Sequence, residues 1–388
     1  MPVPRDDGDI VHAAPVAALL YASTMGRAIV SAIVLGAVIG CATQDTGHAL
    51  TAAEARRWVE QQLPTALPDR GGWAADIVAA FTALQIAATR DNLCAALAVT
   101  EQESSFRADP AVPGLAAIAR QEIDRRAERA GVPQIAVRAA LGLTSPDGRS
   151  YGERIDAVRT ERELSELFDD FIDMVPLGRT FFSNRNPVRT GGAMQVSIAF
   201  AEANAERYPY RVPDSIRREV FTRRGGLYFG IAHLLDYEAP YLQPLYRFAD
   251  FNAGRYASRN AAFQNALALA SGIRLVLDGD LLPPGLADPE RPGSTEKAAF
   301  ALAGKLEMSQ ADVRRDLQRG TEADFERTRL YQRVYALADQ RRSSALPRAV
   351  LPRITLQSPK ITRRLTTEWF ARRVDERHQR CMARASDG

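Results

Sequence analysis

The chain has 388 residues, of which 46% are hydrophobic and 25% are charged, and its formal net charge at pH 7 is +3. The length fits one large domain or two ordinary ones, and the composition is that of a globular protein rather than a disordered one. The nearly balanced charge argues against a dedicated nucleic-acid binder, although a local basic patch is compatible with it.

A compartment signal lies near the N-terminus. The segment from Met25 to Cys41 carries one arginine and then an apolar run that is too short for an ordinary transmembrane helix but has the size of a secretory signal. It ends in Val-Ile-Gly-Cys, which resembles the lipobox of bacterial lipoproteins, so the resemblance predicts lipidation at Cys41. We expect residues 1–40 to be a signal region that starts at Met25. The alternative is a buried helix that ends in cysteine.

Residues 41–70 are expected to form a tether and a leading helix. That helix should span Ala52 to Leu63, because Thr51 and Glu54 have the spacing of a capping box and prolines follow. A thick apolar face predicts the next helix at Ala74 to Ala88.

A third helix should begin after Asp91, a natural N-cap, and end near Glu103. Glu103 continues one apolar face of this helix, whereas Glu101 lies roughly 200° around it. The two carboxylates therefore cannot both enter one cleft, and Glu101 should face solvent or another contact.

Residues 111–187 show helical periodicity at Leu115 to Ala130 and at Glu161 to Met174, with a turn at residues 145–149. Beyond this segment we expect a mainly α chain, with a strand or loop at 275–282 and a boundary in the Pro/Gly-rich stretch 283–292. Helices are predicted at Ser197–Arg207, Gly226–Asp236, Asn260–Ser271, Thr295–Lys305, Ser309–Arg319, Glu322–Ala338 and Lys360–Arg384, with Ser309 and Thr321 as candidate N-caps.

The last part of the chain is basic. Residues 341–388 hold twelve Lys or Arg against four Asp or Glu, a local charge of 12 − 4 = +8. The simpler interpretation is a solvated helix face with ion pairs. The functional one is contact with anionic lipid headgroups or cell-wall carboxylates.

Three short signatures occur in order: Glu103-Ser-Ser-Phe106, Gly192-Ala-Met-Gln195 and Phe251-Asn-Ala-Gly254. Together they resemble the active-site pattern of lytic transglycosylases of the goose-type-lysozyme-like superfamily, which cut the glycan strands of bacterial peptidoglycan. The whole chain also looks like an uncharacterised family of bacterial envelope lipoproteins. The resemblance implies an all-α lysozyme-like domain over residues 71–282. Residues 111–187 would be a helical insertion on its cleft, and 293–388 a helical, basic C-terminal extension.

The resemblance also implies a reaction. One glutamate, Glu103, would protonate the glycosidic oxygen between N-acetylmuramic acid and N-acetylglucosamine, and then act as base toward the C6 hydroxyl of the same sugar. The product is a 1,6-anhydro end, and no cofactor is needed. Such an acid needs a raised pKa, which burial among apolar groups provides. The Cys41 lipid anchor, followed by Ala42 rather than Asp, would hold the protein at the outer membrane, facing the periplasm.

By the same resemblance the other signature residues take supporting roles. Ser104 would contact substrate or orient the glutamate, and Asn252 would hold an acetamido or hydroxyl group. A cleft wall would be formed by Gly192, Met194 and Gln195, while Ala253 and Gly254 would keep a turn narrow.

Many relatives carry tyrosine where this chain has Phe251, so a hydrogen bond to the catalytic carboxyl is lost unless Tyr256 replaces it. This leaves three alternatives open. The chain could be a peptidoglycan-binding or scaffold lipoprotein without turnover, or a helical interaction lipoprotein unrelated to lysozymes. It could also be a hydrolytic muramidase, with Asp109 or Asp250 as its second carboxylate.

Two cysteines remain if Cys41 is lipidated. In an oxidising periplasm Cys94 and Cys381 could form a disulfide, or they could be two free thiols. We expect no metal site, because no His/Cys spacing suits zinc and Asp278-Gly-Asp280 lacks the further positions of a calcium loop. His233, on an apolar helix face, is expected to be a core residue. Protein partners other than peptidoglycan are not indicated, and nucleic acid is disfavoured for an exported chain.

Overall fold

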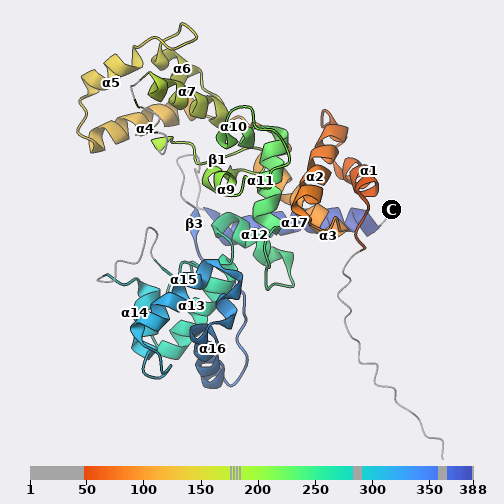
Figure 1. The fold of residues 1–388 in the computed structure, drawn as a ribbon, viewed down its shortest axis with the longest axis vertical. Coiled ribbons are helices and arrows are strands. Elements are labelled where there is room, and N and C mark those ends of the chain that lie inside the picture. Colours follow the sequence, from red (N-terminus) through yellow and green to blue (C-terminus); the bar gives the residue numbers. More distant parts are fainter. Residues whose placement is uncertain are drawn as a thin grey trace, which may run out of the picture. The chain divides into compact units, whose positions relative to one another are not determined.

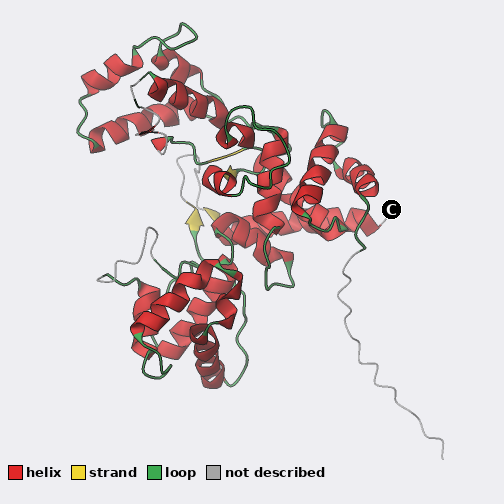
Figure 2. Cartoon of the chain, in the orientation of Figure 1, coloured by secondary structure: helices red, strands yellow, loops and turns green. Residues whose placement is uncertain are grey.

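The computed structural model describes residues 48–174, 177, 180, 182, 185–282, 291–356 and 365–386. These residues are mainly helical (Figures 1 and 2), which confirms the expected mainly α class. The strands among them are two residues long and form two antiparallel pairs. The first pair is β1 (Thr190–Gly191) with β2 (Val196–Ser197), and the second is β3 (Thr355–Leu356) with β4 (Leu365–Thr366). The predicted signal region and Cys41 lie outside the described residues. No helix in the described part is long and apolar enough to cross a membrane.

The first apolar core is built around one helix, α11 (Arg223–Leu235), which contacts α2, α3, α9, α10, α12 and β2. Its sequence, with three glycines and a run of apolar residues, suits burial on nearly all sides. The other helices of this core are α1 (Ala52–Gln62), α2 (Arg70–Leu84), α3 (Arg90–Ser104), α9 (Ile198–Ala203), α10 (Ile216–Val220), α12 (Pro244–Ala253) and α17 (Thr367–Ser386).

Local capping explains where these helices start. Thr51 and Glu54 form the predicted capping box at α1. The prediction that Asp91 caps α3 is wrong, because Thr89 is the N-cap and its hydroxyl accepts a hydrogen bond from the Asn92 N–H at 3.2 Å. Asp91 lies instead in the first turn, where a negative charge is favoured by the helix dipole. There its carboxylate approaches His378 Nε2 of α17 at 3.1 Å.

A second apolar core consists of α13 (Ala257–Ser271), α14 (Ser294–Leu302), α15 (Gln310–Gln318) and α16 (Arg329–Arg342). Two short 3-10 helices, Arg319–Thr321 and Ala323–Arg327, connect α15 to α16. Ser309 caps α15 as predicted, whereas Thr328, not Thr321, caps the helix that follows. The stretch 275–282 is a loop. Helix α13 was expected in the first domain, but its apolar residues, such as Phe263, pack against α14 and α16.

Helix α17 belongs to the first core although it ends the chain. It lies against α3 and α12 and buries Phe370, Ala371 and Val374. Cys381 is bonded to Cys94 of α3 by a disulfide, with the two Cα atoms 5.6 Å apart. The expected extension 293–388 is therefore divided between two cores, because contacts distant in sequence decide the partners of its helices.

Basic residues of α17 largely have acidic partners. Arg372 pairs with Glu368 at 2.9 Å and Arg373 pairs with Glu376 at 2.7 Å. Arg377 and Arg380 both approach Glu101 of α3, at 3.4 and 3.7 Å, which is the separate contact expected for Glu101. These pairs favour the interpretation of a solvated face with ion pairs.

The segment that is expected to be an insertion forms a third, smaller core. Its helices are α4 (Leu115–Arg129), α5 (Gln134–Leu141), α6 (Tyr151–Ala157) and α7 (Glu161–Asp173), and two of them match the predicted ones closely. The predicted turn at 145–149 precedes α6, which Ser150 caps. An antiparallel bridge between Ala111 and Thr160 closes the base of this segment, so the start of α7 returns to the chain just beyond α3.

Candidate active site

Glu103 lies in the last turn of α3, which ends because Ser105 and Phe106 take left-handed φ angles of 51° and 58°. Ser104 is buried, and its hydroxyl donates to the Thr100 carbonyl at 3.2 Å and accepts from the Arg107 N–H at 3.1 Å. Ser104 therefore stabilises the C-terminal end of α3. Its hydroxyl is occupied within the protein, which does not match the expected contact with substrate.

The carboxyl of Glu103 has an unusual electrostatic setting. Burial raises its pKa to about 8, and the negative charge of Glu161 adds to the effect. No hydrogen bond or ion pair joins this carboxyl to another residue within the described ranges. Glu103 is therefore largely protonated at neutral pH and keeps its proton available for transfer.

Glu161, which sequence reasoning missed, is the carboxylate that acts on Glu103. It is the first residue of α7 and is 6% exposed. The capping box of Thr160 and Glu163 fixes the start of this helix, and the bridge from Thr160 to Ala111 brings that start back toward α3. The capping box was visible in the sequence, but the return of the insertion toward Glu103 was not.

The two carboxylates that were expected to serve as partners are engaged elsewhere. Asp109 pairs with Arg162 at 2.9 Å. Asp250 is fully buried and accepts hydrogen bonds from the Tyr241 hydroxyl at 2.7 Å and from the Ser258 N–H at 2.7 Å. Asp250 therefore holds the junction between α12 and α13, and neither residue matches the predicted second carboxylate.

The Gly192–Gln195 signature is the turn between β1 and β2. A Cβ atom on Gly192, whose φ is 76°, would lie 2.2 Å from the Val220 carbonyl oxygen, so glycine lets the turn approach the packed helices. Met194 is fully buried, and a Cβ at Gly230 of α11 would meet its side chain at 2.5 Å. These two residues serve packing rather than an open cleft wall. Gln195 is half-buried, and its amide donates to the Gly192 carbonyl at 3.2 Å.

The Phe251–Gly254 signature ends helix α12 and is not a free narrow turn. Pro244 starts this helix and Gly254 follows its last residue, a pattern typical of helix ends. Asn252 Oδ1 accepts a hydrogen bond from the Thr367 hydroxyl of α17 at 2.9 Å. Because of this bond, Asn252 already has a partner within the protein.

Phe251 stacks on Phe370 with ring centres 6.5 Å apart, and its carbonyl oxygen lies 3.3 Å from His233 Nε2. Burial lowers the pKa of His233 to about 4, so this ring is neutral. Its buried Nδ1 has no hydrogen-bond partner among the described residues, so the expectation of a satisfied core histidine holds only in part. Tyr256 packs against Tyr237 and against the Arg259 guanidinium, 4.1 Å from its ring centre. No described contact brings Tyr256 to Glu103.

All three signatures nevertheless surround one helix, because α3, β2 and α12 each contact α11. The described residues show no direct hydrogen bond or ion pair among Glu103, Gln195 and Asn252. Within the same ranges no group of three His, Cys, Asp or Glu side chains could hold a metal ion. The site thus consists of the protonated Glu103 carboxyl, which has no hydrogen-bond partner among the described residues, and the buried Glu161 nearby.

Residues 66–384 match the profile of a family described as a protein of unknown function, DUF1615. The chain belongs to this family. It is 56% identical over 324 residues to the uncharacterized protein YaiW of Escherichia coli (strain K12), and the alignment covers 84% of this chain and 88% of that protein. No solved structure matches the chain significantly. The family match includes all three signatures, both disulfide cysteines and the insertion.

Proposed function

We propose that the chain is a peptidoglycan lytic transglycosylase-like lipoprotein in which Glu103 is the acid and base. The observation that carries this proposal is the Glu103 carboxyl itself, which has a pKa of about 8 and no hydrogen-bonding partner among the described residues. A carboxylic acid that stays protonated at neutral pH is what cleavage of a glycosidic bond requires.

The reaction proceeds in two proton transfers. Glu103 gives its proton to the glycosidic oxygen, and the bond from C1 of the muramic acid to that oxygen breaks. The resulting carboxylate then takes the proton of the C6 hydroxyl as that oxygen bonds to C1, which regenerates the acid. No water is consumed, and the nucleophile within the sugar provides the effective concentration.

Among the expected binding residues, Gln195 fits substrate contact best. Its half-buried amide donates to the Gly192 carbonyl and accepts from the Thr190 hydroxyl, and its second N–H and second lone pair suit an acetamido group. Ser104, Met194 and Asn252 would act indirectly by shaping the supports of the site. Phe251 supplies a ring but no hydroxyl, so Glu103 would work without the tyrosine hydrogen bond that many lytic transglycosylases have.

A second candidate is hydrolytic cleavage by a muramidase. Glu161 motivates it, because hydrolases use a second carboxylate to activate water or to act as nucleophile. In the transglycosylase the same residue has a simpler role, since its charge keeps Glu103 protonated. In both cases a lipid anchor at Cys41 would place the enzyme at the outer membrane, next to its peptidoglycan substrate.

The deciding experiment is product analysis. A soluble form that starts at Ala42 is incubated with purified sacculi, and the released fragments are identified by mass spectrometry. Anhydro-muropeptides support the proposal if Glu103→Gln lowers their rate of release by about 10²- to 10⁴-fold, the usual size of acid–base catalysis. Glu101→Gln is the matched control, because it lies on the same helix but faces α17, and it should retain most of the activity.

The other outcomes are equally informative. Fragments with reducing ends would replace the transglycosylase by a muramidase, with Glu161→Gln then expected to abolish turnover. Sacculus binding without any released product would indicate a scaffold that has lost catalysis. The Gln variant at position 103 should be at least as heat-stable as the parent at pH 8, which separates loss of chemistry from loss of fold.

A further inference from the structure

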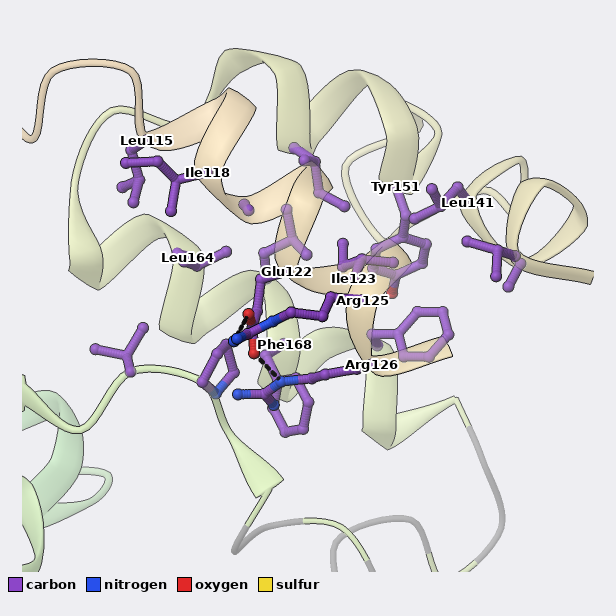
Figure 3. A pocket seen from close by; sticks show the side chains of 18 of the residues that line it. Leu115, Ile118, Glu122, Ile123, Arg125, Arg126, Leu141, Tyr151, Leu164 and Phe168 are labelled. Carbon is purple, nitrogen blue, oxygen red and sulfur yellow. Dashed lines mark hydrogen bonds and ion pairs between the residues drawn. The ribbon is translucent and has the colours of Figure 1, made fainter. Parts of the chain in front are cut away.

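The insertion encloses a cavity of about 600 Å³ between α4, α5, α6, α7 and residues 187–190 (Figure 3). Protein interiors contain few voids larger than a water molecule, whereas ligand pockets measure about 300–1,000 Å³. A hollow of this size therefore has the dimensions of a binding site. Its walls are mainly aliphatic and aromatic, and they include Leu115, Ile118, Ile123, Leu141, Leu164 and Phe168.

One buried polar group in this wall lacks a partner. Tyr151 is fully buried, and its ring packs edge-on against Phe171 with centres 5.1 Å apart. The Tyr151 hydroxyl makes no hydrogen bond with any residue in the described ranges. Figure 3 shows its ring among the side chains that line the hollow. The hydroxyl oxygen has almost no exposed surface, and its charged neighbours include Asp170 and Arg154, so an anionic head group would not lie at Tyr151.

The polar part of the lining has a surplus of positive charge. Arg125 and Arg126 of α4 both pair with the single carboxylate of Glu122, the second at 2.6 Å (Figure 3). Two guanidinium groups against one carboxylate leave one positive charge in this cluster, and the opposite charges of Arg189 and Glu161, which also line the cavity, leave that surplus unchanged. Both arginine side chains are about half exposed, at 52% and 46%, so an anionic group can reach them from solvent.

We propose that this cavity binds a single-chain fatty acid. The hydrocarbon tail would fill the apolar cavity, and the carboxylate would pair with the half-exposed guanidinium groups of Arg125 and Arg126. A sugar would find too few polar groups along these walls, and a cationic amphiphile would be repelled by the arginines. Glu161, which acts on Glu103, also lines this cavity, but the binding test measures probe fluorescence and therefore does not depend on the proposed function.

Binding is measured on the form that starts at Ala42, which contains all three apolar cores. The probe is cis-parinaric acid, a fatty acid whose fluorescence rises in an apolar site, and palmitate competes against it. Hexadecanol and hexadecyltrimethylammonium, with the same chain length, are the head-group controls. We expect saturable binding of one probe per chain, with palmitate competing about tenfold better than the alcohol, since a hydrogen bond to a charged group is stronger than one between neutral groups.

Two pairs of variants locate the site. Ala140→Phe would fill the cavity and abolish probe binding, whereas Ala139→Phe, on an exposed neighbouring position of α5 outside the lining, should leave binding unchanged. Arg126→Gln should weaken palmitate binding about fivefold while changing hexadecanol binding by less than twofold, because only the ion pair with the head group is lost. Arg125→Gln should reduce the preference for palmitate over the alcohol.

Several results would overturn the assignment. The parent could fail to bind the probe while its circular dichroism shows a folded chain, or Ala140→Phe could bind as well as the parent. Equal competition by palmitate and hexadecanol would remove the head-group part of the proposal. Glu103→Gln serves as an independent control and should bind the probe like the parent, whatever its effect on sacculi.

Discussion

At neutral pH Glu103 is protonated because burial and the charge of Glu161 raise its pKa to about 8. The proposed reaction needs this proton in its first chemical step, so the rate of sacculus cleavage should fall as pH rises through about 8. Glu161→Gln removes the neighbouring negative charge and lowers the pKa of Glu103. The alkaline fall in kcat/KM should then begin at a lower pH, as measured from the rate of fragment release across pH 5 to 10.

Glu166→Gln, on the same helix as Glu161, is the control for this shift and should leave the pH profile in place. An unchanged profile in Glu161→Gln would show that the alkaline limb belongs to another group.

The sequence located Glu103 because its helix and its signature are local features. It could not locate Glu161, since only the folding of the insertion back toward α3 brings the two carboxylates together.

The other signature residues also differ in this way, because some of their features are local in the sequence and others depend on distant contacts. Gly192 and Gly254 were expected in the walls and turns of a cleft, and the structure uses them where a turn approaches packed helices and where a helix ends. Local sequence patterns predict such backbone features well. They do not show that the Asn252 side chain is held by Thr367, because that residue lies 115 positions away.

Among the helices, the pairing of α3 with α17 is the contact that most directly supports the site. The disulfide between Cys94 and Cys381 joins residues 287 positions apart, so it restricts the unfolded chain strongly. Replacing both cysteines by alanine should lower the free energy of unfolding by about 2–5 kcal/mol. The measurement is the guanidinium denaturation midpoint under non-reducing conditions.

Reduction provides the control for this prediction. A reductant should lower the midpoint of the parent to nearly that of the double alanine variant and should leave the variant unchanged. Equal midpoints for the oxidised parent and the variant would mean that the bridge does not stabilise the fold. The prediction of this bridge rested on compartment chemistry and left free thiols open, since sequence spacing alone cannot establish a contact between distant helices.

Across the whole molecule, the cores do not follow the order of the chain. Most helices were predicted within a few residues, because periodicity and caps are local signals. The partners of α13 and α17 could not be predicted, since α13 joins the helices that follow it and α17 returns to the helices that began the chain. The boundary expected near residue 283 therefore cuts through a core rather than between two domains.

This arrangement predicts how truncated chains behave. A chain of residues 46–356 loses only the last strand pair and α17, so Phe370, Ala371 and Val374 no longer cover α3 and α12. Hydrogen exchange of the backbone amides should become fast in α2 and α3 while α13 to α16 stay protected.

A chain of residues 46–282 also lacks α14 to α16, so α13 should lose protection as well, because the apolar residues around Phe263 are then exposed. Slow exchange in α3 of either truncated chain would show that the first core stands without α17, and the expected boundary would then be a real one.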